Sequence, residues 1–196
     1  MAFGLDEKVK DGQILIFDFG GGTFDVCLVN VEDGIMQVKD TEGDNWLGGK
    51  NLDNAIVDEI LVPYLKENYT IGSFLDDEVK KSLLKDALKV RAEEIKINLS
   101  FSKSFDIISN LGEYPVDDEG EEIEFDFEVT HDQMIAVLGP VFQKAVDMAK
   151  EVLNRNQLSG ASLSSLILVG GPTFSPVLRE LLTDQICAPD TSVDPM

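Results

Sequence analysis

The chain has 196 residues and 43% of them are hydrophobic, which is enough for one compact domain, or one domain with a subdomain, around a buried core. Its formal charge of −21 would repel a nucleic-acid backbone or an anionic lipid surface, so neither is expected as a partner. The two cysteines, Cys27 and Cys187, form no Cys-x-x-Cys pair, which argues against a zinc site and a disulfide framework.

The sequence also gives no sign of membrane insertion or export. No apolar stretch approaches the roughly 20 residues that a membrane-spanning helix needs. The N-terminal residues Met1-Ala2-Phe3-Gly4 do not start a basic region followed by an apolar one, as a signal peptide would. We therefore expect a cytoplasmic protein.

Three strands are expected at the start of the chain. An apolar run at 14–19, interrupted by Asp18, stops at three glycines, and a second run at 23–31 follows directly. Asp33-Gly34 is typical of a hairpin turn because both residue types tolerate a positive φ. Residues 35–41 then complete a three-stranded antiparallel meander.

Two helices are expected next. In the first, apolar residues recur on one face at Leu52, Ile56, Ile60 and Tyr64. Pro63 should kink or end this helix, because proline lacks the N–H that an interior helical position donates. A longer helix is expected from a capping box at 73–76 to about residue 99. Its expected apolar face consists of Val79, Leu83, Ala87, Ile95 and Leu99.

The period then changes from helical to alternating. Residues 123–129 alternate between apolar and acidic side chains, which is typical of a half-buried strand with a charged outer face. Residues 105–108 are its expected partner strand. The acidic stretch 117–122 between them is interpreted as a solvated hairpin loop, a surface feature only.

A helix, a strand and a helix are expected at the end of the chain. A capping box at 130–133 opens a helix in which His131 should be exposed and structural rather than catalytic, and Gly139-Pro140 should bend it. A buried strand at 163–169 ends in two glycines, and Ser175 and Pro176 should be the N-cap and first residue of the last helix. The apolar residues of the first of these helices are Leu138, Phe142, Ala145, Ala149 and Val152.

The first glycine loop has the composition of a phosphate and metal site. It reads Asp18-Phe-Gly-Gly-Gly-Thr-Phe-Asp25, and its glycines, Gly20, Gly21 and Gly22, allow backbone N–H groups to approach a large anion. Thr23 adds a hydroxyl donor. Asp18 and Asp25 suit a hydrated Mg²⁺, a hard cation that prefers oxygen ligands. The alternative is a glycine-rich hairpin without a ligand, but an Asp inside a buried apolar run is costly without a partner.

The second glycine loop reads Val169-Gly170-Gly171-Pro172-Thr173 and links a buried strand to a helix N-terminus, where unpaired N–H groups favour phosphate. Alone it fits an ordinary strand–helix connection equally well. The two loops together are more specific, because they end apolar strands that we expect to be neighbours in one mixed sheet.

These loops carry a resemblance to a known family. The run ILIFDFGGGTFDVCLVNV resembles the second phosphate signature of the heat shock protein 70 kDa (DnaK-type) chaperone family. The segments AFGLDEKV, WLGGKNLDN, AEEIKINLS and LILVGGPTFSP resemble further motifs of that family in the same order, so the resemblance covers essentially the whole chain. It implies the second lobe (subdomains IIA and IIB) of an actin-like, ribonuclease-H-like ATPase domain, an α/β fold carrying an inserted α+β subdomain.

The resemblance also implies site residues. Asp18, as the catalytic carboxylate, and Asp25 would lie near Mg²⁺, a monovalent cation such as K⁺ and the attacking water. The first loop would bind the β- and γ-phosphates of ATP or ADP, and the second loop would approach the nucleotide from the other side. Ile97 and Phe174 would hold the adenine between them. The ribose and adenine would lie on a helix face formed by Glu93, Lys96 and Ser100.

The chain departs from the family pattern at four positions. Cys27 stands where Ser or Thr is usual, Phe174 replaces an Arg, Ser175 replaces an aliphatic residue, and Met196 falls where an acidic residue is usual. The change at Phe174 argues against a normal nucleotide affinity, and together the departures indicate a divergent relative rather than a housekeeping chaperone. We expect a base pocket that survives, depends on Phe174 and tolerates purine changes more readily.

The resemblance implies a division of the chain and a role for a longer parent. Residues 1–47 and 136–196 would form the base of the lobe, and 48–135 an insert that moves as a unit about Gly48-Gly49. The chain is interpreted as a fragment that lacks the first lobe and the substrate-binding domain, and alone it should not hydrolyse ATP. In the parent, ATP hydrolysis would gate the binding of unfolded peptides, and a nucleotide-exchange factor would bind the insert.

Two other classes of protein remain open. A sugar kinase of the same fold should lack the GGGTFD motif followed by LGG. A divergent actin-like ATPase, a filament subunit or a pseudo-ATPase would serve as an interaction or assembly module rather than as a chaperone. A β-rich peptide-binding domain downstream in the parent reading frame would favour the chaperone.

Overall fold

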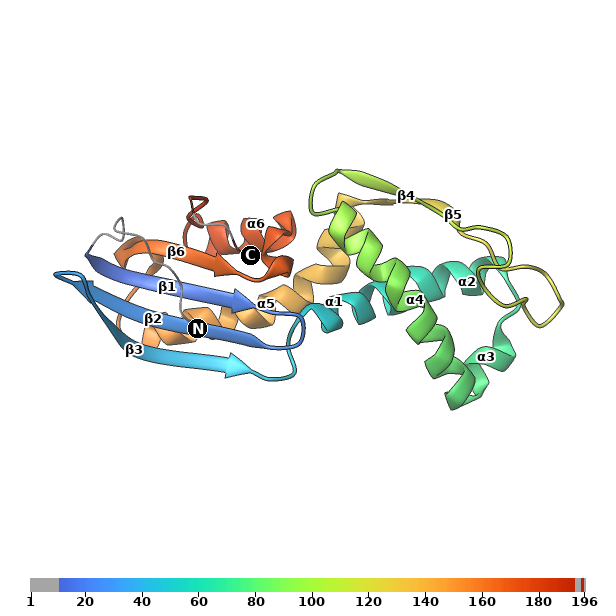
Figure 1. The fold of residues 1–196 in the computed structure, drawn as a ribbon, viewed down its shortest axis with the longest axis horizontal. Coiled ribbons are helices and arrows are strands. Elements are labelled where there is room, and N and C mark those ends of the chain that lie inside the picture. Colours follow the sequence, from blue (N-terminus) through green and yellow to red (C-terminus); the bar gives the residue numbers. More distant parts are fainter. Residues whose placement is uncertain (1–10, 193–194, 196) are drawn as a thin grey trace. The chain divides into compact units, whose positions relative to one another are not determined.

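The computed structural model describes residues 11–192 and 195 of the chain (Figure 1). It divides into two compact units, each described here by itself. The base unit comprises Met1–Gly49 and Val141–Met196, and the insert unit comprises Lys50–Pro140. The family-like segment at residues 2–9 and the departure at Met196 lie outside the described residues.

The base unit contains a four-stranded mixed sheet of order β3-β2-β1-β6. As predicted, the first three strands form an antiparallel meander, and β6 runs parallel to β1. Asp33 and Gly34 form the β2–β3 turn with φ angles of 51° and 74°, the left-handed conformation that Asp-Gly tolerates. The strands are β1 (Gly12–Phe19), β2 (Phe24–Glu32), β3 (Ile35–Asp44) and β6 (Leu163–Val169).

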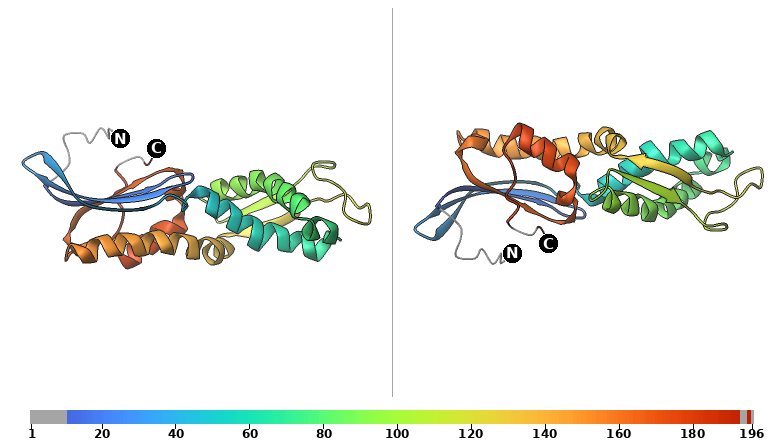
Figure 2. Two further views of the ribbon diagram at one scale, coloured as in Figure 1. Left: turned by 90° about the horizontal axis from the view of Figure 1, so that it is seen from below. Right: turned by 90° about the horizontal axis from the view of Figure 1, so that it is seen from above.

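Two helices cover one face of this sheet (Figure 2): the base-unit part of α5 (His131–Arg155), and α6 (Pro176–Gln185). The side chains of Gln143 and Gln185 exchange two amide hydrogen bonds, of 2.9 and 2.7 Å, between the helices. The core beneath them is aromatic, with ring centroids 4.7 Å apart for Phe17 and Phe24 and 5.3 Å apart for Phe19 and Phe142. Because side chains alternate along a strand, this packing directs Asp18 to the opposite face.

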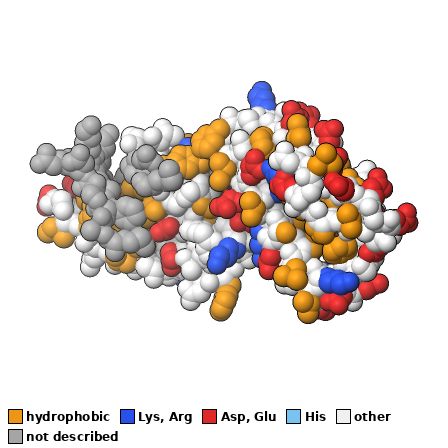
Figure 3. Space-filling view, turned by 45° about the vertical axis from the view of Figure 1, so that its right-hand side comes forward, with side chains coloured by type: hydrophobic (Ala, Val, Ile, Leu, Met, Phe, Trp, Pro, Cys, Tyr) orange, Lys and Arg blue, Asp and Glu red, His pale blue; other side chains and the backbone are white. Residues whose placement is uncertain are grey.

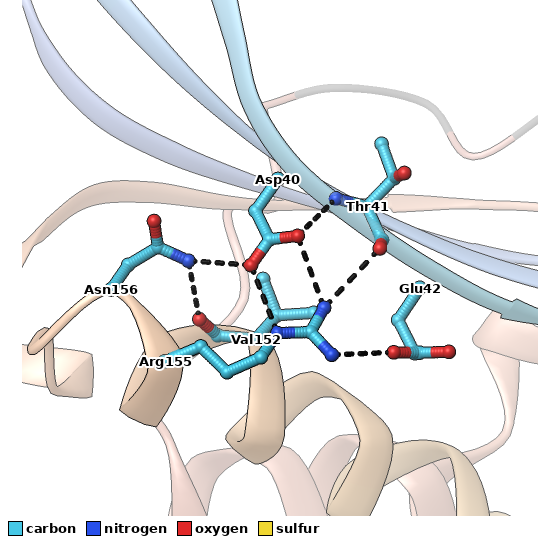
Figure 4. Close-up of polar contacts among 6 residues, drawn as sticks. All are labelled: Asp40, Thr41, Glu42, Val152, Arg155 and Asn156. Atoms are coloured by element: carbon cyan, nitrogen blue, oxygen red, sulfur yellow. Dashed lines mark hydrogen bonds and ion pairs between the residues drawn. The ribbon is translucent and has the colours of Figure 1, made fainter.

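An ion-pair network joins the edge strand β3 to the end of α5 (Figure 4). The Arg155 guanidinium donates to both carboxylate oxygens of Asp40 at 3.0 Å and to Glu42 at 2.6 Å. The Asn156 amide adds a 2.7 Å bond to Asp40. These bonds lower the pKa of the Asp40 carboxyl below its usual range. They fix β3 to the helix that covers the sheet.

The insert unit begins with a helical segment that continues through Pro63. Of the expected kink or end, the end is wrong, because α1 passes through a π-helical turn into α2, with Pro63 in the first turn of α2. A π turn shifts the hydrogen-bond ladder by one residue, so it accommodates the missing N–H of proline. The elements are α1 (Gly49–Ile56), the π turn (Val57–Leu61) and α2 (Val62–Asn68).

The long helix α4 (Glu78–Asn98) was predicted with the wrong cap and partly the wrong face. Asp77, not Ser73, is its N-cap, and its carboxylate accepts from the amides of Val79 and Lys80. Ser73 lies in the short helix α3 (Gly72–Asp76). The buried residues are Leu84, Leu88, Ala92, Ile95 and Leu99, whereas Val79, Leu83 and Ala87, which we had placed on that face, are exposed.

The strand pair of the insert unit was predicted, although β5 begins at Asp126 rather than at residue 123, and the prediction for the acidic loop was wrong. Strands β4 (Ser104–Ile108) and β5 (Asp126–Thr130) are antiparallel. The Asp117 carboxylate in the loop is buried and accepts from the amides of Thr70, Glu119 and Glu121, each at 2.9 Å. The loop is therefore organised around a buried carboxylate and is more than a solvated surface feature.

The start of α5 follows the predicted capping box. The Thr130 amide donates to the Gln133 side chain at 2.8 Å, and the Gln133 amide donates back to the Thr130 hydroxyl at 3.4 Å. His131, expected to be exposed, is half-buried in the first turn. Among residues 11–192 and 195, no helix is both long enough and apolar enough to cross a bilayer.

Candidate functional site

A tight turn of three glycines joins β1 to β2. The Gly20 amide donates to the Thr23 carbonyl oxygen at 2.8 Å, which closes the turn. The amides of Gly21, Gly22 and Thr23 donate no hydrogen bond to any other described residue. A Cβ atom built on Gly21 or Gly22 would meet no atom within 4 Å. The turn therefore presents unpaired N–H groups beside open space, as a phosphate-binding turn requires.

The backbone of Gly48 and Gly49 packs against this turn. The Gly49 amide donates to the Gly20 carbonyl oxygen at 2.9 Å. A Cβ atom on Gly48 would lie 2.6 Å from the backbone of Gly22, which is closer than real Cβ atoms approach. We had interpreted these two glycines only as a hinge. Gly48 is required by the close packing of two backbone segments.

The second glycine loop packs against the first. Gly170 has a φ of 96°, and a Cβ atom there would lie 2.2 Å from the Phe19 carbonyl oxygen, so no other residue type fits. The Thr173 amide and hydroxyl both donate to the Gly170 carbonyl oxygen, at 3.0 and 2.7 Å, which closes a short 3₁₀ turn at Gly171–Phe174. That turn separates β6 from α6. Ser175 is the backbone N-cap of α6, as predicted, but its buried side chain makes no capping hydrogen bond.

Two carboxylates lie next to these loops. Asp18 on β1 is paired with Asp25 on β2 across the sheet, and Asp25 is paired in turn with Gly43 on β3. A Cβ atom on Gly43 would lie 2.7 Å from a carboxylate oxygen of Asp25, so this glycine makes room for the acid. Partial burial, and then the charge of Asp25, raise the pKa of Asp18. Two like charges opposite each other on a sheet are unfavourable unless a cation joins them.

The donor set suits a hydrated cation rather than a closed metal cage. Within residues 11–192 and 195, no three His, Cys, Asp or Glu side chains gather as a metal-binding group. Mg²⁺ is commonly held by one or two carboxylates together with waters and substrate phosphates. Acidic side chains predominate over basic ones on the face in Figure 3, so a polyphosphate needs such a cation to offset repulsion from the chain.

The predicted base residue Phe174 is half-buried at the end of the second loop. The guanidinium carbon of Arg179, from α6, lies 5.8 Å from the centre of its ring. The Arg179 Nε–H donates to the Thr173 carbonyl oxygen at 2.9 Å. Sequence analysis had not singled out Arg179, because its position five residues after Phe174 is no recognisable pattern.

Cys27, one of the departures from the family pattern, behaves as a small apolar side chain. It is half-buried and packs against a cluster formed by Ile14, Val29, Val31 and Ile167. Burial raises the pKa of its thiol, which therefore has little thiolate character.

The remaining predicted residues lie near the end of α4 in the insert unit. Glu93 is exposed and Ile97 is 52% exposed, whereas Ser100 is half-buried and its hydroxyl donates to the Lys96 carbonyl oxygen at 2.9 Å. The Lys96 ammonium is paired with the Asp53 carboxylate of α1 at 2.6 Å, and both side chains are largely buried. Burial raises the pKa of Asp53, and Lys96 opposes that rise. Asp53 was missed because the two partners are 43 residues apart.

The chain is similar to proteins of one known family over its whole length. The sequence model of the family described as Hsp70 protein matches residues 1–195. The whole chain aligns at 29% identity with 30% of "Chaperone protein DnaK" from Nitrosopumilus maritimus. It aligns at 31% identity with 31% of "Mitochondrial-type heat shock protein 70" from Encephalitozoon hellem. It also aligns at 30% identity with 28% of "Iron-sulfur cluster biogenesis chaperone, mitochondrial" from Saccharomyces cerevisiae. The chain thus spans less than a third of the length of each relative.

Proposed function

Because the chain belongs to the Hsp70 family, whose model covers nearly all of it, we propose that it supplies one side of an ATP/ADP site. The observation that carries this proposal is the meeting of two glycine loops in the base unit. Gly170 packs on the backbone of Phe19, directly beside the first glycine turn, in which the amides of Gly21 and Gly22 are unpaired. The phosphates would be held by Gly20, Gly21, Gly22 and Thr23 on one side and by Gly170, Gly171, Pro172 and Thr173 on the other.

Asp18 and Asp25 would hold Mg²⁺, with K⁺ as a further cation. Two observations support this assignment: the direct pairing of the two residues across β1 and β2, and the raised pKa of Asp18. A bound cation would offset the repulsion between the two carboxylates and lower that pKa. When bound, Mg²⁺ would offset the phosphate charge. Asp18, the more buried of the two carboxylates, would orient the attacking water as the catalytic residue.

The resemblance to the family assigns further residues to the sugar and the base. Glu93 and Lys96 of α4, and Ser100 just after it, would contact the ribose and adenine. Ile97, which is exposed, and Phe174, which is half-buried, would pack against the base. Lys96 would have to share its ammonium between Asp53 and a ribose hydroxyl, since the ion pair is already formed.

The wider role follows from the family and is proposed for a protein with the full length of these relatives. There, ATP hydrolysis would gate the binding of unfolded peptides, and an exchange factor would act at the insert, residues 48–135. The chain alone should bind nucleotide without hydrolysing it, since phosphoryl transfer depends on charge stabilisation from all sides. A cytoplasmic location is proposed, although two of the relatives are named as mitochondrial.

Thermal unfolding of the chain with and without MgADP tests the proposal. A ligand that binds only the folded state raises the free energy of unfolding by RT ln(1 + [L]/Kd), about 2.7 kcal/mol at 100 times Kd. We expect the melting temperature to rise with MgADP concentration and to rise less with MgAMP, which lacks the β-phosphate. Equal shifts with both would show that the glycine loops do not hold the β-phosphate.

A further inference from the structure

A largely buried ion pair joins α1 to α4 within the insert unit. The Lys96 ammonium lies 2.6 Å from a carboxylate oxygen of Asp53, and the two side chains are 13% and 15% exposed. Ile56 and Ala92, one helical turn from the two partners, are completely buried. Core packing therefore fixes the backbone on both sides of the pair, and the carboxylate holds the ammonium at a defined place.

Stability alone does not account for this pair. Burial raises the pKa of Asp53, the hydrogen bond and charge of Lys96 oppose the rise, and the charge of Glu93 adds to it. A net rise means that the charge of Lys96 does not fully offset the loss of hydration of the carboxylate. Buried pairs of this kind are often no more stabilising than apolar side chains of similar volume. Such a pair is typical of a functional site.

The Lys96 ammonium has hydrogen-bonding capacity beyond this pair. It carries three N–H donors, and Asp53 accepts from one of them. No second acceptor for this ammonium lies among the residues that the structure describes. Ser100, one turn later, is held by the 2.9 Å bond from its hydroxyl to the Lys96 carbonyl oxygen. The ammonium is therefore fixed in place and still able to donate to a hydroxyl of a ligand.

We propose that Asp53 is a positioning residue for the ribose of a nucleotide and acts on the ribose through Lys96. This inference rests on the proposed nucleotide site, in which Lys96 contacts the sugar. A mobile lysine side chain loses rotamer entropy when a ligand orders it. Here Asp53 orders the side chain beforehand, so a bond from the ammonium to a ribose hydroxyl forms at a lower entropic cost. Asp53 should therefore increase the preference for ribose over a sugar without these hydroxyls.

The test compares two nucleotides that differ only in the two ribose hydroxyls. Affinities of the chain for MgATP and for the magnesium complex of 2′,3′-dideoxy-ATP are measured by ligand-observed NMR, which detects weak binding. The variants are Asp53→Asn, Lys96→Met and their double variant. Asp58→Asn is the matched control, because it removes the same charge from a carboxylate that pairs with Lys85 of α4 at 2.6 Å.

Amide NMR spectra verify that each variant is folded. If Asp53→Asn is not folded, Asp53→Glu replaces it, because this change keeps the charge and displaces the carboxylate by one methylene. The same loss of preference for ribose is expected in either variant.

We expect the wild type to bind MgATP about 5- to 20-fold more tightly than the dideoxy nucleotide. Asp53→Asn should reduce this preference at least about 3-fold, because a neutral amide holds an ammonium less firmly than a carboxylate does. In the Lys96→Met background the same change should alter the preference less than about 2-fold, because the ammonium through which Asp53 acts is gone. Asp58→Asn should leave the preference within a factor of about two.

Three results would overturn the inference: an unchanged preference in Asp53→Asn, an equally large loss of preference in Asp58→Asn, or an undiminished effect without Lys96. An equal loss of affinity for both nucleotides leaves the preference unchanged and would assign Asp53 a purely structural role. A wild-type chain that binds both nucleotides equally would refute the ribose contact while the proposed phosphate site stands. Binding of neither nucleotide would refute the proposed function itself.

Discussion

Asp18 and Asp25 are directly paired across β1 and β2, at the end of the sheet where the first glycine turn begins. Alternation along the strands turns both carboxylates away from the aromatic core of Phe17, Phe19 and Phe24. When both carboxylates are ionised, their repulsion lowers the free energy of unfolding. Groups that destabilise a fold in this way are typical of functional sites, where a ligand offsets the repulsion. The first prediction follows from this relationship.

Asp18→Asn should stabilise the metal-free chain at neutral pH. The pKa of Asp18 is raised, so the fold favours its protonated form, and the penalty appears as the pH rises above the ordinary value of 3.8. The uncharged amide lacks that penalty, and we expect the melting temperature to rise by about 1–3 °C. The gain should vanish at pH 3. Mg²⁺ should stabilise the wild type and not the variant; equal stabilisation by Mg²⁺ in both would remove Asp18 from the metal site.

Gly48→Ala should disrupt the first glycine turn by displacing the backbone of Gly22. The new methyl group would lie 2.6 Å from the Gly22 backbone, which cannot move aside as a flexible side chain would. We expect a loss of about 1–3 kcal/mol in the free energy of unfolding, measured by urea denaturation. Gly139→Ala in α5 is the matched control, because a Cβ atom there meets nothing within 4 Å. It should be neutral or slightly stabilising. If both variants unfold at the same urea concentration, Gly48 has no packing role.

Lys96→Met should destabilise the insert unit by leaving Asp53 buried without its partner. The pair is short, at 2.6 Å, and largely buried, so we expect a loss of about 1–3 kcal/mol in the free energy of unfolding. Adding Asp53→Asn to Lys96→Met should restore part of that loss, because no unpaired charge remains. Lys81→Met is the control, since its pair with Glu78 on the same helix is more exposed than the Lys96–Asp53 pair. No recovery in the double variant would indicate that Lys96 acts through packing alone.

The Arg155 network predicts a pH-dependent contribution to stability. The pKa of Asp40 is lowered by its hydrogen bonds to Arg155 and Asn156. Its contribution is therefore complete above the unfolded value of 3.8 and is lost as the pH falls through the lower folded value. Arg155→Met should lower the melting temperature at pH 7 by a few degrees, and the difference should shrink below about pH 4. A difference that is the same at pH 7 and pH 3 would rule out this ion pair as its source.

Local patterns were sufficient to predict the base-unit sheet. Asp33-Gly34 has intrinsic turn chemistry, and the apolar runs of β1, β2 and β6 were long enough to be recognised as strands. In α4 the prediction failed because the helix carries apolar residues on two faces. Leu84 and Leu88 are buried while Val79 and Leu83 are exposed, and only contacts with the rest of the unit decide between them.

In the candidate site, too, residues with a local sequence pattern were predicted and residues that act through distant partners were missed. Gly20–Gly22 and Gly170 were identified because consecutive glycines before a carboxylate or a helix are unusual. Gly43, Asp53 and Arg179 were missed because each acts through a partner on another element or several residues away. Asp117 was assigned to solvent because a run of acidic residues usually is solvated, yet it accepts three backbone hydrogen bonds. Long-range pairing of this kind has no local sequence signature.

The most direct test of the account is the Gly21→Ala variant, studied by amide NMR during a titration with MgATP. A methyl group on Gly21 meets no atom within 4 Å, so the fold should be unchanged, but the group would occupy the space assigned to a phosphate. In the wild type, the amides of Gly21, Gly22, Thr23 and Gly171 should shift together along one binding curve. In the variant, affinity should fall at least about 10-fold while the melting temperature stays within about 2 °C. Wild-type affinity in the variant, or shifts confined to residues outside the two glycine loops, would contradict the assignment of a nucleotide site to this chain.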